Sequence, residues 1–279
     1  MIDVTIWGTR GSLASPGAET ARFGGNTACV AVRADDTILV LDAGTGVRRL
    51  GASWPNGVRR VDLLLTHLHM DHIQGLGFFQ PLYDDGMEVH IWAPASPTLD
   101  LRKRLSRYLS PPFFPVHLRD LDCRLNLHEV PCGDFSIGPF RISAALVCHP
   151  GPTVGYRIEN AQAAMAYLPD HEPALGVTNF PGLPEWTSGY GLAAGVDLLI
   201  HDAQYAADEY PDHTGWGHSS VEHAMRFAAL AHAKHLVLFH HDPAHSDHDI
   251  ARIVDAAVAT LHPEFQVTPA EEGAVFRLG

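Results

Sequence analysis

The sequence predicts an α/β fold built from mixed β-sheets, and three features of the chain support this class. The first 60 residues consist of short apolar runs joined by tight turns, which indicates strands in hairpins. Further along, apolar runs of strand length alternate with amphipathic stretches, which indicates strands alternating with helices. Histidine and aspartate repeatedly follow the apolar runs directly. Folds of this class place their sites outside strand ends, so these polar residues form the candidate site.

The N-terminal region is expected to be rich in hairpins. Its predicted strands are joined by glycine turns and by the turn at Asp35-Asp36, and a tight turn at 43–46 leads into a short helix. The expected elements are strands at 4–7, 28–32 and 38–42 and a helix near 47–50.

The remaining chain is expected to continue the alternation as a single domain over residues 1–279, because no linker or low-complexity segment interrupts it. Two pseudo-equivalent halves are the alternative. Residues 78–120 are expected to form a cap over the site. The expected strands are 61–65, 89–92, 126–130, 140–147, 154–158, 163–168, 197–200, 235–239 and 273–278, and the expected helices are 99–108, 219–232 and 250–261.

Composition narrows the class of partner. Hydrophobic residues make up 46% of the chain and charged residues 18%, which is typical of a protein with a packed core. The formal net charge of −13 argues against long nucleic acid as a partner, whereas a small anionic substrate is compatible with it if metal ions reverse the local field. Four cysteines without C-x-x-C spacing suggest neither a zinc knuckle nor a redox motif. We find no leader and no apolar run of membrane-spanning length, so the expectation is a cytoplasmic protein without membrane contact.

The stretch from His67 to His72 carries most of the functional information. It places three imidazoles and one carboxylate in six positions, directly after the apolar strand 61–65. Histidine nitrogen and aspartate oxygen are ligands of Zn²⁺ and similar divalent ions. His67 and His69 can point the same way, while Asp71 and His72 can face a second ion beside the first. A polar surface loop is the alternative interpretation, but the spacing and the preceding strand favour a metal site.

This H-x-H-x-D-H pattern resembles the metallo-β-lactamase superfamily. The resemblance implies a four-layer αββα sandwich of two mixed β-sheets flanked by helices. It also implies two divalent metal ions, with Zn²⁺ as the default and Mn²⁺ or Fe²⁺ also suited to the ligands. Carried over in chain order, the resemblance assigns the first ion to His67, His69 and His149, the second to Asp71, His72 and His240, and a bridging role to Asp170.

Each of the later candidates has a simpler interpretation. His149 could be a hydrogen-bonded loop histidine, and Asp170 could be a helix cap before Pro173. His240 has a rival in His241, although the register favours His240 because Phe239 is the last residue of the predicted strand.

The second half of the chain resembles the tRNase Z and small phosphodiesterase branch of the superfamily. Residues 201–205, H-D-A-Q-Y, resemble the H-E-A-T stretch of tRNase Z, with Asp202 in place of Glu. His218, in G-H-S-S, resembles its H-S-T motif, and residues 8–12, G-T-R-G-S, resemble the start of the same branch. The resemblance implies phosphodiester hydrolysis by a hydroxide held between two metals, which Asp71 steers or deprotonates. His218 would hold a phosphoryl oxygen or protonate the leaving group, and Asp202 would orient it. The simpler interpretation makes His218 a neighbour of the helix cap formed by Ser219 or Ser220.

Departures from tRNase Z favour a small phosphodiester, such as a cyclic nucleotide, over tRNA. The chain lacks a long basic insertion rich in Gly and Pro, and it is acidic. Two alternatives remain open: a lactone, thioester or β-lactam hydrolase of the same fold, and a catalytically silent metal-binding sensor. The resemblance also implies a homodimer.

The expected cap contains an aromatic pair and a basic helix. Phe113 and Phe114 could stack on a base, while Arg102, Lys103, Arg104 and Arg107 could attract phosphate. An ordinary solvated helix followed by a buried aromatic loop is an equally good interpretation.

Overall fold

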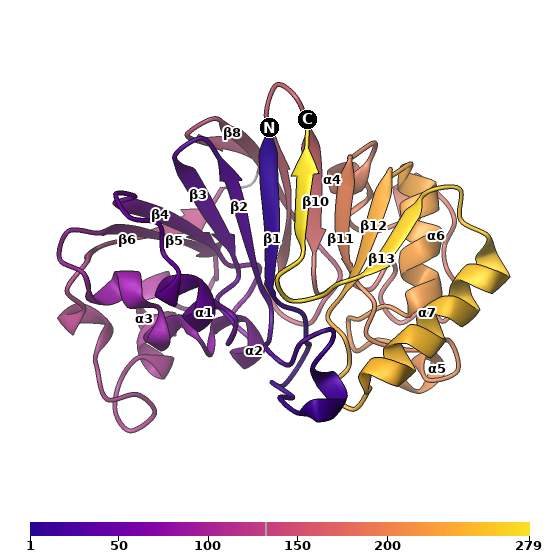
Figure 1. Cartoon of the computed structure of the whole chain (residues 1–279), viewed down its shortest axis with the longest axis horizontal. Helices are drawn as coiled ribbons and strands as arrows, with labels where there is room; N and C mark the ends of the chain where they lie inside the picture. Colours follow the sequence, from indigo (N-terminus) through magenta and orange to yellow (C-terminus); the bar gives the residue numbers. More distant parts are fainter. Residues whose placement is uncertain (132) are drawn as a thin grey trace.

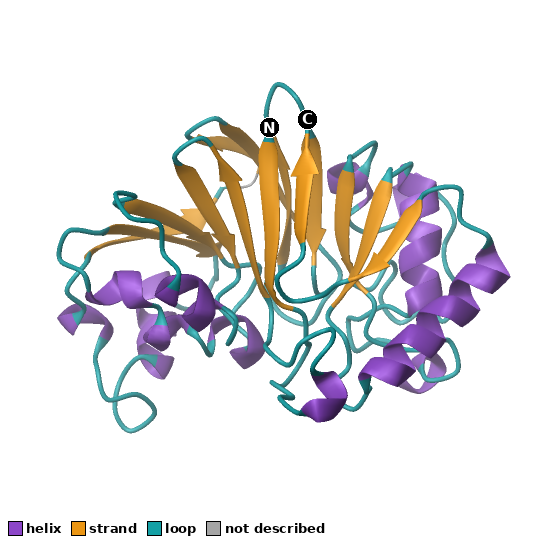
Figure 2. Cartoon of the chain, in the orientation of Figure 1, coloured by secondary structure: helices purple, strands orange, loops and turns teal. Residues whose placement is uncertain are grey.

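The computed structural model describes residues 1–131 and 133–279 and shows two β-sheets packed face to face with helices on their outer surfaces (Figure 1, Figure 2). This four-layer arrangement confirms the predicted αββα sandwich. Cys132 lies outside the described residues; Cys29, Cys123 and Cys148 are free thiols.

The first sheet combines N-terminal hairpins with parallel strands. Its seven strands follow the order β14-β1-β2-β3-β4-β5-β6, antiparallel from β14 to β3 and parallel from β3 to β6. The bounds are β1 Ile2–Gly8, β2 Cys29–Ala34, β3 Thr37–Leu41, β4 Arg60–Leu64, β5 Glu88–Pro94, β6 Arg124–Val130 and β14 Val275–Leu278.

The second sheet repeats this plan. Its seven strands follow the order β13-β12-β11-β10-β9-β8-β7, antiparallel from β7 to β10 and parallel from β10 to β13. The bounds are β7 Gly133–Ile137, β8 Phe140–Leu146, β9 Val154–Glu159, β10 Ala164–Leu168, β11 Leu198–Asp202, β12 His235–Phe239 and β13 Gln266–Pro269.

Short and long helices cover the outer faces. The α-helices are α1 Val47–Ala52, α2 Met70–Ile73, α3 Leu101–Tyr108, α4 Tyr190–Ala193, α5 Tyr210–His213, α6 Val221–Ala231 and α7 Asp247–Leu261. The 3₁₀ turns are η1 Ala18–Thr20, η2 Leu76–Phe78, η3 Gln80–Tyr83, η4 Leu118–Asp120 and η5 Pro184–Trp186. Within the described part of the chain, no helix has both the length and the apolar character needed to cross a membrane.

Three hydrophobic cores hold the layers together. The central core lies between the sheets, where alternate residues of β1, such as Ile2, Val4 and Ile6, are fully buried. A second core joins the first sheet to α1 and α3, and a third joins the second sheet to α4, α6 and α7. Strands buried on both faces are apolar throughout, which explains why they were readable from the sequence.

Some element boundaries differ from the prediction for local reasons. Helix α3 begins at Leu101 rather than residue 99 because the Asp100 side chain accepts a hydrogen bond from Lys103 N and caps it. Helix α7 begins at Asp247 rather than residue 250 because Ser246 and Asp249 form a capping box. Two edge strands, β7 and β13, were not predicted; the exposed residues of β7 give it no continuous apolar signal. Within the expected cap 78–120, β5 is a strand of the first sheet.

The candidate site residues follow the carboxyl ends of strands from both sheets. The carboxyl ends of β4, β8, β10, β11 and β12 all lead into loops at the same edge of the sandwich, the lower edge in Figure 1.

Candidate metal centre

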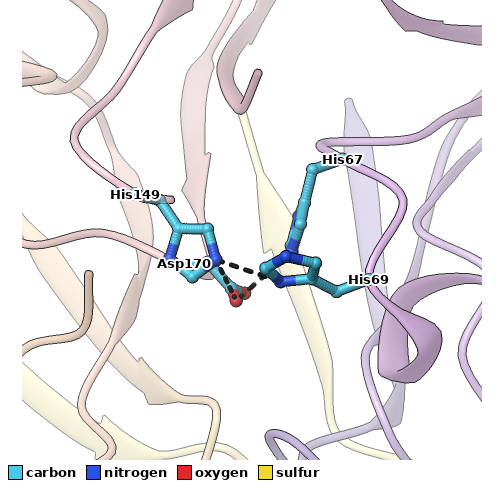
Figure 3. Close-up of side chains that lie close together, drawn as sticks. All are labelled: His67, His69, His149 and Asp170. Atoms are coloured by element: carbon cyan, nitrogen blue, oxygen red, sulfur yellow. Dashed lines mark hydrogen bonds and ion pairs between the residues drawn. The ribbon is translucent and has the colours of Figure 1, made fainter. Parts of the chain in front are cut away.

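The first cluster gathers four of the predicted residues from three loops. The ligand atoms of His67, His69, His149 and Asp170 all lie within 4.8 Å of one another. Figure 3 shows their side chains pointing toward a common centre. His149 Nε2 is 3.2 Å from His69 Nδ1, and Asp170 Oδ2 is 3.6 Å from His149 Nε2 and 3.7 Å from His67 Nε2.

A second cluster lies beside the first and shares Asp170 with it. The ligand atoms of Asp71, His72, Asp170 and His240 also lie within 4.8 Å of one another. Asp170 Oδ1 is 2.9 Å from His72 Nε2 and 3.2 Å from His240 Nε2. Because one oxygen of Asp170 faces each cluster, this carboxylate is placed where a bridging ligand belongs. All seven predicted metal ligands therefore come together in two adjacent groups.

Hydrogen bonds on the far side of each ring aim the histidines at the centre. His72 Nδ1 contacts Asp42 Oδ2 at 2.8 Å, His149 Nδ1 contacts the Gly217 carbonyl at 2.8 Å, and His240 Nδ1 contacts Gln204 Oε1 at 3.1 Å. A ring whose Nδ1–H is donated in this way presents the lone pair of Nε2 to the cluster. Such outer contacts are the usual means of fixing the tautomer of a metal-binding histidine.

The orphaned polar atoms in the cluster fit divalent cations. His67 Nε2, His72 Nε2 and Asp170 Oδ1 are buried. The 2.9 Å contact between His72 Nε2 and Asp170 Oδ1 does not have the alignment of a hydrogen bond, so none of the three atoms has a hydrogen-bond partner among the described residues. Buried polar atoms without partners are rare and costly, so a site that contains three of them calls for a ligand. Borderline-hard nitrogen and oxygen donors are the set that Zn²⁺, Mn²⁺ and Fe²⁺ accept.

Electrostatics support the same conclusion. Burial lowers the pKa of His67, His69 and His149, which keeps these imidazoles neutral and able to donate a lone pair. Burial by itself would raise the pKa of Asp170, but the imidazoles of His240, His72 and His67 hold it well below its usual range. Burial also opposes protonation of His72, but the carboxylates beside it, Asp170 first, raise its pKa well above the usual value. A metal ion that binds this ring therefore displaces a proton, and the ionised Asp170 supplies negative charge that attracts the ion.

The tight approach of the chain around His240 explains the glycine in the N-terminal motif. His240 directly follows β12 with φ of 62°, and a Cβ atom on Gly11 would lie 2.2 Å from its Nδ1. Gly11 N donates to the carbonyl of His241, whose own ring turns away and contacts the Ala270 carbonyl at 3.1 Å. Of the two candidate histidines, His240 is therefore the one that faces the cluster.

His218 and Asp202 form a pair at the margin of the clusters, as predicted. His218 Nδ1 is 2.7 Å from Asp202 Oδ2, and its ring stacks on His240 with centroids 4.9 Å apart. Burial opposes protonation of His218, but the Asp202 carboxylate outweighs it and raises the pKa of His218 to about 9. The N-cap of α6 is Ser220, whose side chain accepts from His223 N, so His218 does lie near the helix cap, as the simpler interpretation expected. Its contact with Asp202 is additional to that position.

Asp202, His218 and His240 also form a group with the spacing of a metal site. Asp202 is fully buried, and its oxygens already accept hydrogen bonds from the backbone N–H groups of His171, Gln204 and Ser219. A carboxylate occupied in this way serves to orient an imidazole rather than to bind an ion.

Sequence reasoning missed two buried carboxylates that build the site. Asp42 is fully buried and accepts from Thr66 N, His72 Nδ1 and Tyr167 Oη. Glu172, also fully buried, accepts from three glycine N–H groups and from Tyr210 Oη, and one of these glycines is Gly217. The position of Asp42 at a strand end was the only signal for it, and nothing in the sequence marked Glu172.

The basic helix and aromatic pair of the expected cap divide into different environments. Phe114 is 7% exposed, whereas Phe113 is 77% exposed. Arg104 is partly buried and donates to the Pro94 carbonyl, while Arg107 is exposed. Phe113 and Arg107 are therefore exposed, as contact with a ligand requires. Phe114 and Arg104 instead pack within the protein, as the alternative interpretation expected.

Two adjacent clusters of imidazoles and carboxylates at the edge of an αββα sandwich define the class as a metal-dependent hydrolase of the metallo-β-lactamase fold. The family described as beta-lactamase superfamily domain matches residues 37–241. The chain belongs to this family.

Known proteins resemble the chain over most of its length. It is 25% identical to a protein named Ribonuclease Z from Natronomonas pharaonis over 278 residues, covering 85% of this chain and 86% of the relative. The crystal structure of the metallo-beta-lactamase fold protein YhfI from Bacillus subtilis has a TM-score of 0.72 at 22% identity, covering 100% of this chain and 99% of that one. A diphosphatase from the PhnP family has a TM-score of 0.70 at 17% identity, covering 100% and 98%.

Proposed function

We propose that this hydrolase is a phosphodiesterase that acts on a small phosphodiester and uses two divalent cations, with Zn²⁺ as the default. The observation that carries the proposal is the His218–Asp202 pair at the margin of the metal clusters. Hydrolysis of an amide or an ester develops charge on one carbonyl oxygen and on the leaving group. Phosphodiester cleavage develops charge on several phosphoryl oxygens as well as on the leaving alkoxide, so a protonated imidazole in addition to the metal ions is suited to it.

The residues that would hold the cations are the two adjacent groups. His67, His69 and His149 would hold one, and Asp71, His72 and His240 the other, with Asp170 between them. Bound there, two such ions supply an activated water at neutral pH and neutralise phosphoryl charge.

Three side chains supply the remaining chemistry. Asp71, whose Oδ2 is held by a 2.8 Å hydrogen bond from Ser12 N, orients the attacking water or accepts its proton. His218 donates a hydrogen bond to a phosphoryl oxygen or a proton to the leaving oxygen. Asp202 acts through His218, because it fixes the ring and stabilises its protonated form.

The acidity of the chain favours a small substrate over a long one. A formal net charge of −13 offers little attraction to a polyanion, whose affinity depends on many cationic contacts. Relatives named Ribonuclease Z act on RNA, which links the family to phosphodiester bonds. We therefore propose a cyclic nucleotide or another small phosphodiester. We also propose that residues 1–279 act as one catalytic domain, with parts of 78–120 beside the site.

The test is a substrate panel on the isolated protein with and without a chelator. We expect turnover of bis(p-nitrophenyl) phosphate and of cyclic nucleotides that is lost on chelation and restored by Zn²⁺ or Mn²⁺. Turnover restricted to a lactone or to nitrocefin would overturn the phosphodiesterase assignment. Efficient cleavage of a precursor tRNA without cleavage of small esters would overturn the assignment of substrate size.

A further inference from the structure

A large groove lies next to the metal clusters and has no role in the chemistry described above. Its volume is about 690 Å³, which is within the range of pockets that hold small ligands. The residues that matter for its function are Leu68, Met70, Phe78, Arg107, Tyr108 and Phe113.

Helix α2 contributes residues both to the groove and to the second metal cluster. Asp71 and His72 belong to the second metal cluster, while Met70 and Ile73 line the groove. His69 lies between Leu68 and Met70, both of which line the groove, and His69 is the one exposed residue among the seven proposed ligands. The metal centre is thus accessible at His69, at the border of the groove.

The wall of the groove is aromatic. Phe114 meets Phe78 edge-on with centroids 5.5 Å apart and lies 6.0 Å from Tyr108. The Tyr108 hydroxyl donates to the Gln74 carbonyl, so its polar atom is already used within the protein. A Cβ atom on Gly77 would lie 2.5 Å from the Phe114 ring, so this glycine permits Phe114 to pack closely. Phe114 is therefore part of the fixed wall, whereas the 77% exposed Phe113 remains available to a ligand.

One cation of the groove is uncommitted. Arg104 donates to the Pro94 carbonyl and lies 3.8 Å from Glu129, so its charge is partly used. Arg107 is exposed and forms no ion pair or hydrogen bond with another described residue. In an acidic chain, an exposed aromatic surface beside a free guanidinium fits a ligand that is both planar and anionic.

We infer that this groove holds an aromatic group of the substrate, a nucleobase or an aryl ester, while the phosphodiester lies at the metal centre. Phe113 stacks on the ring, and Arg107 attracts the anion toward His69. The identity of the reacting group rests on the proposed function; the binding preference for an aromatic group does not.

The experiment is a calorimetric comparison of ligand pairs that differ only in an aromatic group, using the full-length protein with its metals. AMP is paired with ribose 5-phosphate, and phenyl phosphate with methyl phosphate. We expect the aromatic member to bind roughly tenfold more tightly, the size of a typical stacking contribution. The first pair reports a nucleobase and the second an aryl group.

Variants test whether Phe113 and Arg107 cause the tighter binding of aromatic ligands. Phe113→Ala is expected to abolish the preference while leaving ribose 5-phosphate binding unchanged. Arg107→Gln is expected to weaken AMP binding severalfold at low salt and less at high salt, because exposed charges are screened. The matched controls are Arg48→Gln, an exposed arginine of α1 outside the groove, and Val275→Ala, an apolar residue 51% exposed on β14. Both should behave like the wild type.

Two results would overturn the inference: no aromatic preference in either pair, or a preference that survives Phe113→Ala. The binding measurement is independent of turnover. An aromatic preference without any phosphodiester turnover would remove the proposed function and leave the groove as a ligand site. Turnover of bis(p-nitrophenyl) phosphate without an aromatic preference would remove the groove's role alone.

Discussion

Two histidine–carboxylate pairs, one from each half of the molecule, share the same contact between a carboxylate oxygen and Nδ1 but lie in different surroundings. Asp42 follows β3 of the first sheet and lies 2.8 Å from His72 Nδ1; Asp202 ends β11 of the second sheet and lies 2.7 Å from His218 Nδ1. Both carboxylates are fully buried. In both pairs, the carboxylate holds Nδ1 and leaves Nε2 to face the site.

The surroundings of Nε2 differ. His72 is fully buried, and its Nε2 lies within 3.3 Å of Asp71 and 2.9 Å of Asp170. The side chain of His218 is 11% exposed, and its ring packs against the rings of His240 and His149. We propose from this comparison that an oriented imidazole serves as a metal ligand where carboxylates surround its Nε2, as in His72. We propose that it serves as a proton donor where its Nε2 is not surrounded by carboxylates, as in His218.

The largest expected effect comes from breaking the second pair. His218→Gln should lower kcat on bis(p-nitrophenyl) phosphate by about 10²–10⁴, the usual contribution of a positioned acid or base. Metal content should stay at the wild-type value because His218 is not among the proposed ligands. Steady-state kinetics with elemental analysis measure both quantities, and the exposed His248→Gln serves as the control. An unchanged kcat would remove His218 from the mechanism.

A buried histidine next to Asp202 of the second pair predicts that the stability of the protein depends on pH. His201 Nδ1 donates to the Asp202 carbonyl, and burial lowers the pKa of His201 from 6.5 to about 4. Between these values, the unfolded chain binds a proton that the folded chain does not, so stability falls as pH drops from about 6.5 to 4. The loss is on the order of 3 kcal/mol.

Urea unfolding across that pH range, with chelator present throughout, measures this effect. His201→Gln should reduce the slope of unfolding free energy against pH. An identical slope in the variant would show that His201 is not the titrating group.

Breaking the first pair should affect metal affinity rather than proton transfer. Asp42→Asn removes the carboxylate that orients His72, and such outer contacts typically change metal affinity by about 10–100-fold. Competition with a chromogenic chelator measures this affinity. Asp202→Asn is the matched variant and should keep wild-type affinity while losing turnover. Equal losses of metal affinity in the two variants would show that Asp42 and Asp202 do not have different roles.

The smallest expected effect concerns the loop that supports His149. Glu172 accepts hydrogen bonds from Gly215 N at 2.8 Å and Gly217 N at 3.1 Å, and the Gly217 carbonyl contacts His149 Nδ1. Glu172→Gln turns one acceptor into a donor facing an N–H group, which should cost about 1–3 kcal/mol of stability. Thermal unfolding measures this, with the exposed Glu185→Gln as control. A variant as stable as the control would show that the loop does not depend on Glu172.

The sequence revealed the proposed metal ligands but not the carboxylates that support them. The predicted ligands follow strands with strong apolar signals, so their strand-end positions were readable, and the structure brings all seven together. The α/β class was likewise predictable from the alternation of strands and helices, and the αββα arrangement from the H-x-H-x-D-H resemblance. Asp42 and Glu172 were not identified because their role depends on contacts between distant segments, as in the bond from Tyr167 Oη to Asp42. The groove was only partly predicted. Phe113 and Phe114 are neighbours of the same residue type, so the sequence could not show that Phe114 is buried while Phe113 is exposed.

The most direct test of the central claim is the metal content of His72→Gln and His218→Gln, measured beside the wild type in one elemental analysis. We predict about two divalent ions per chain in the wild type and in His218→Gln, and fewer than two in His72→Gln. Loss of metal from His218→Gln, full retention by His72→Gln, or a wild type that binds no metal after reconstitution would contradict the division of labour between the two pairs.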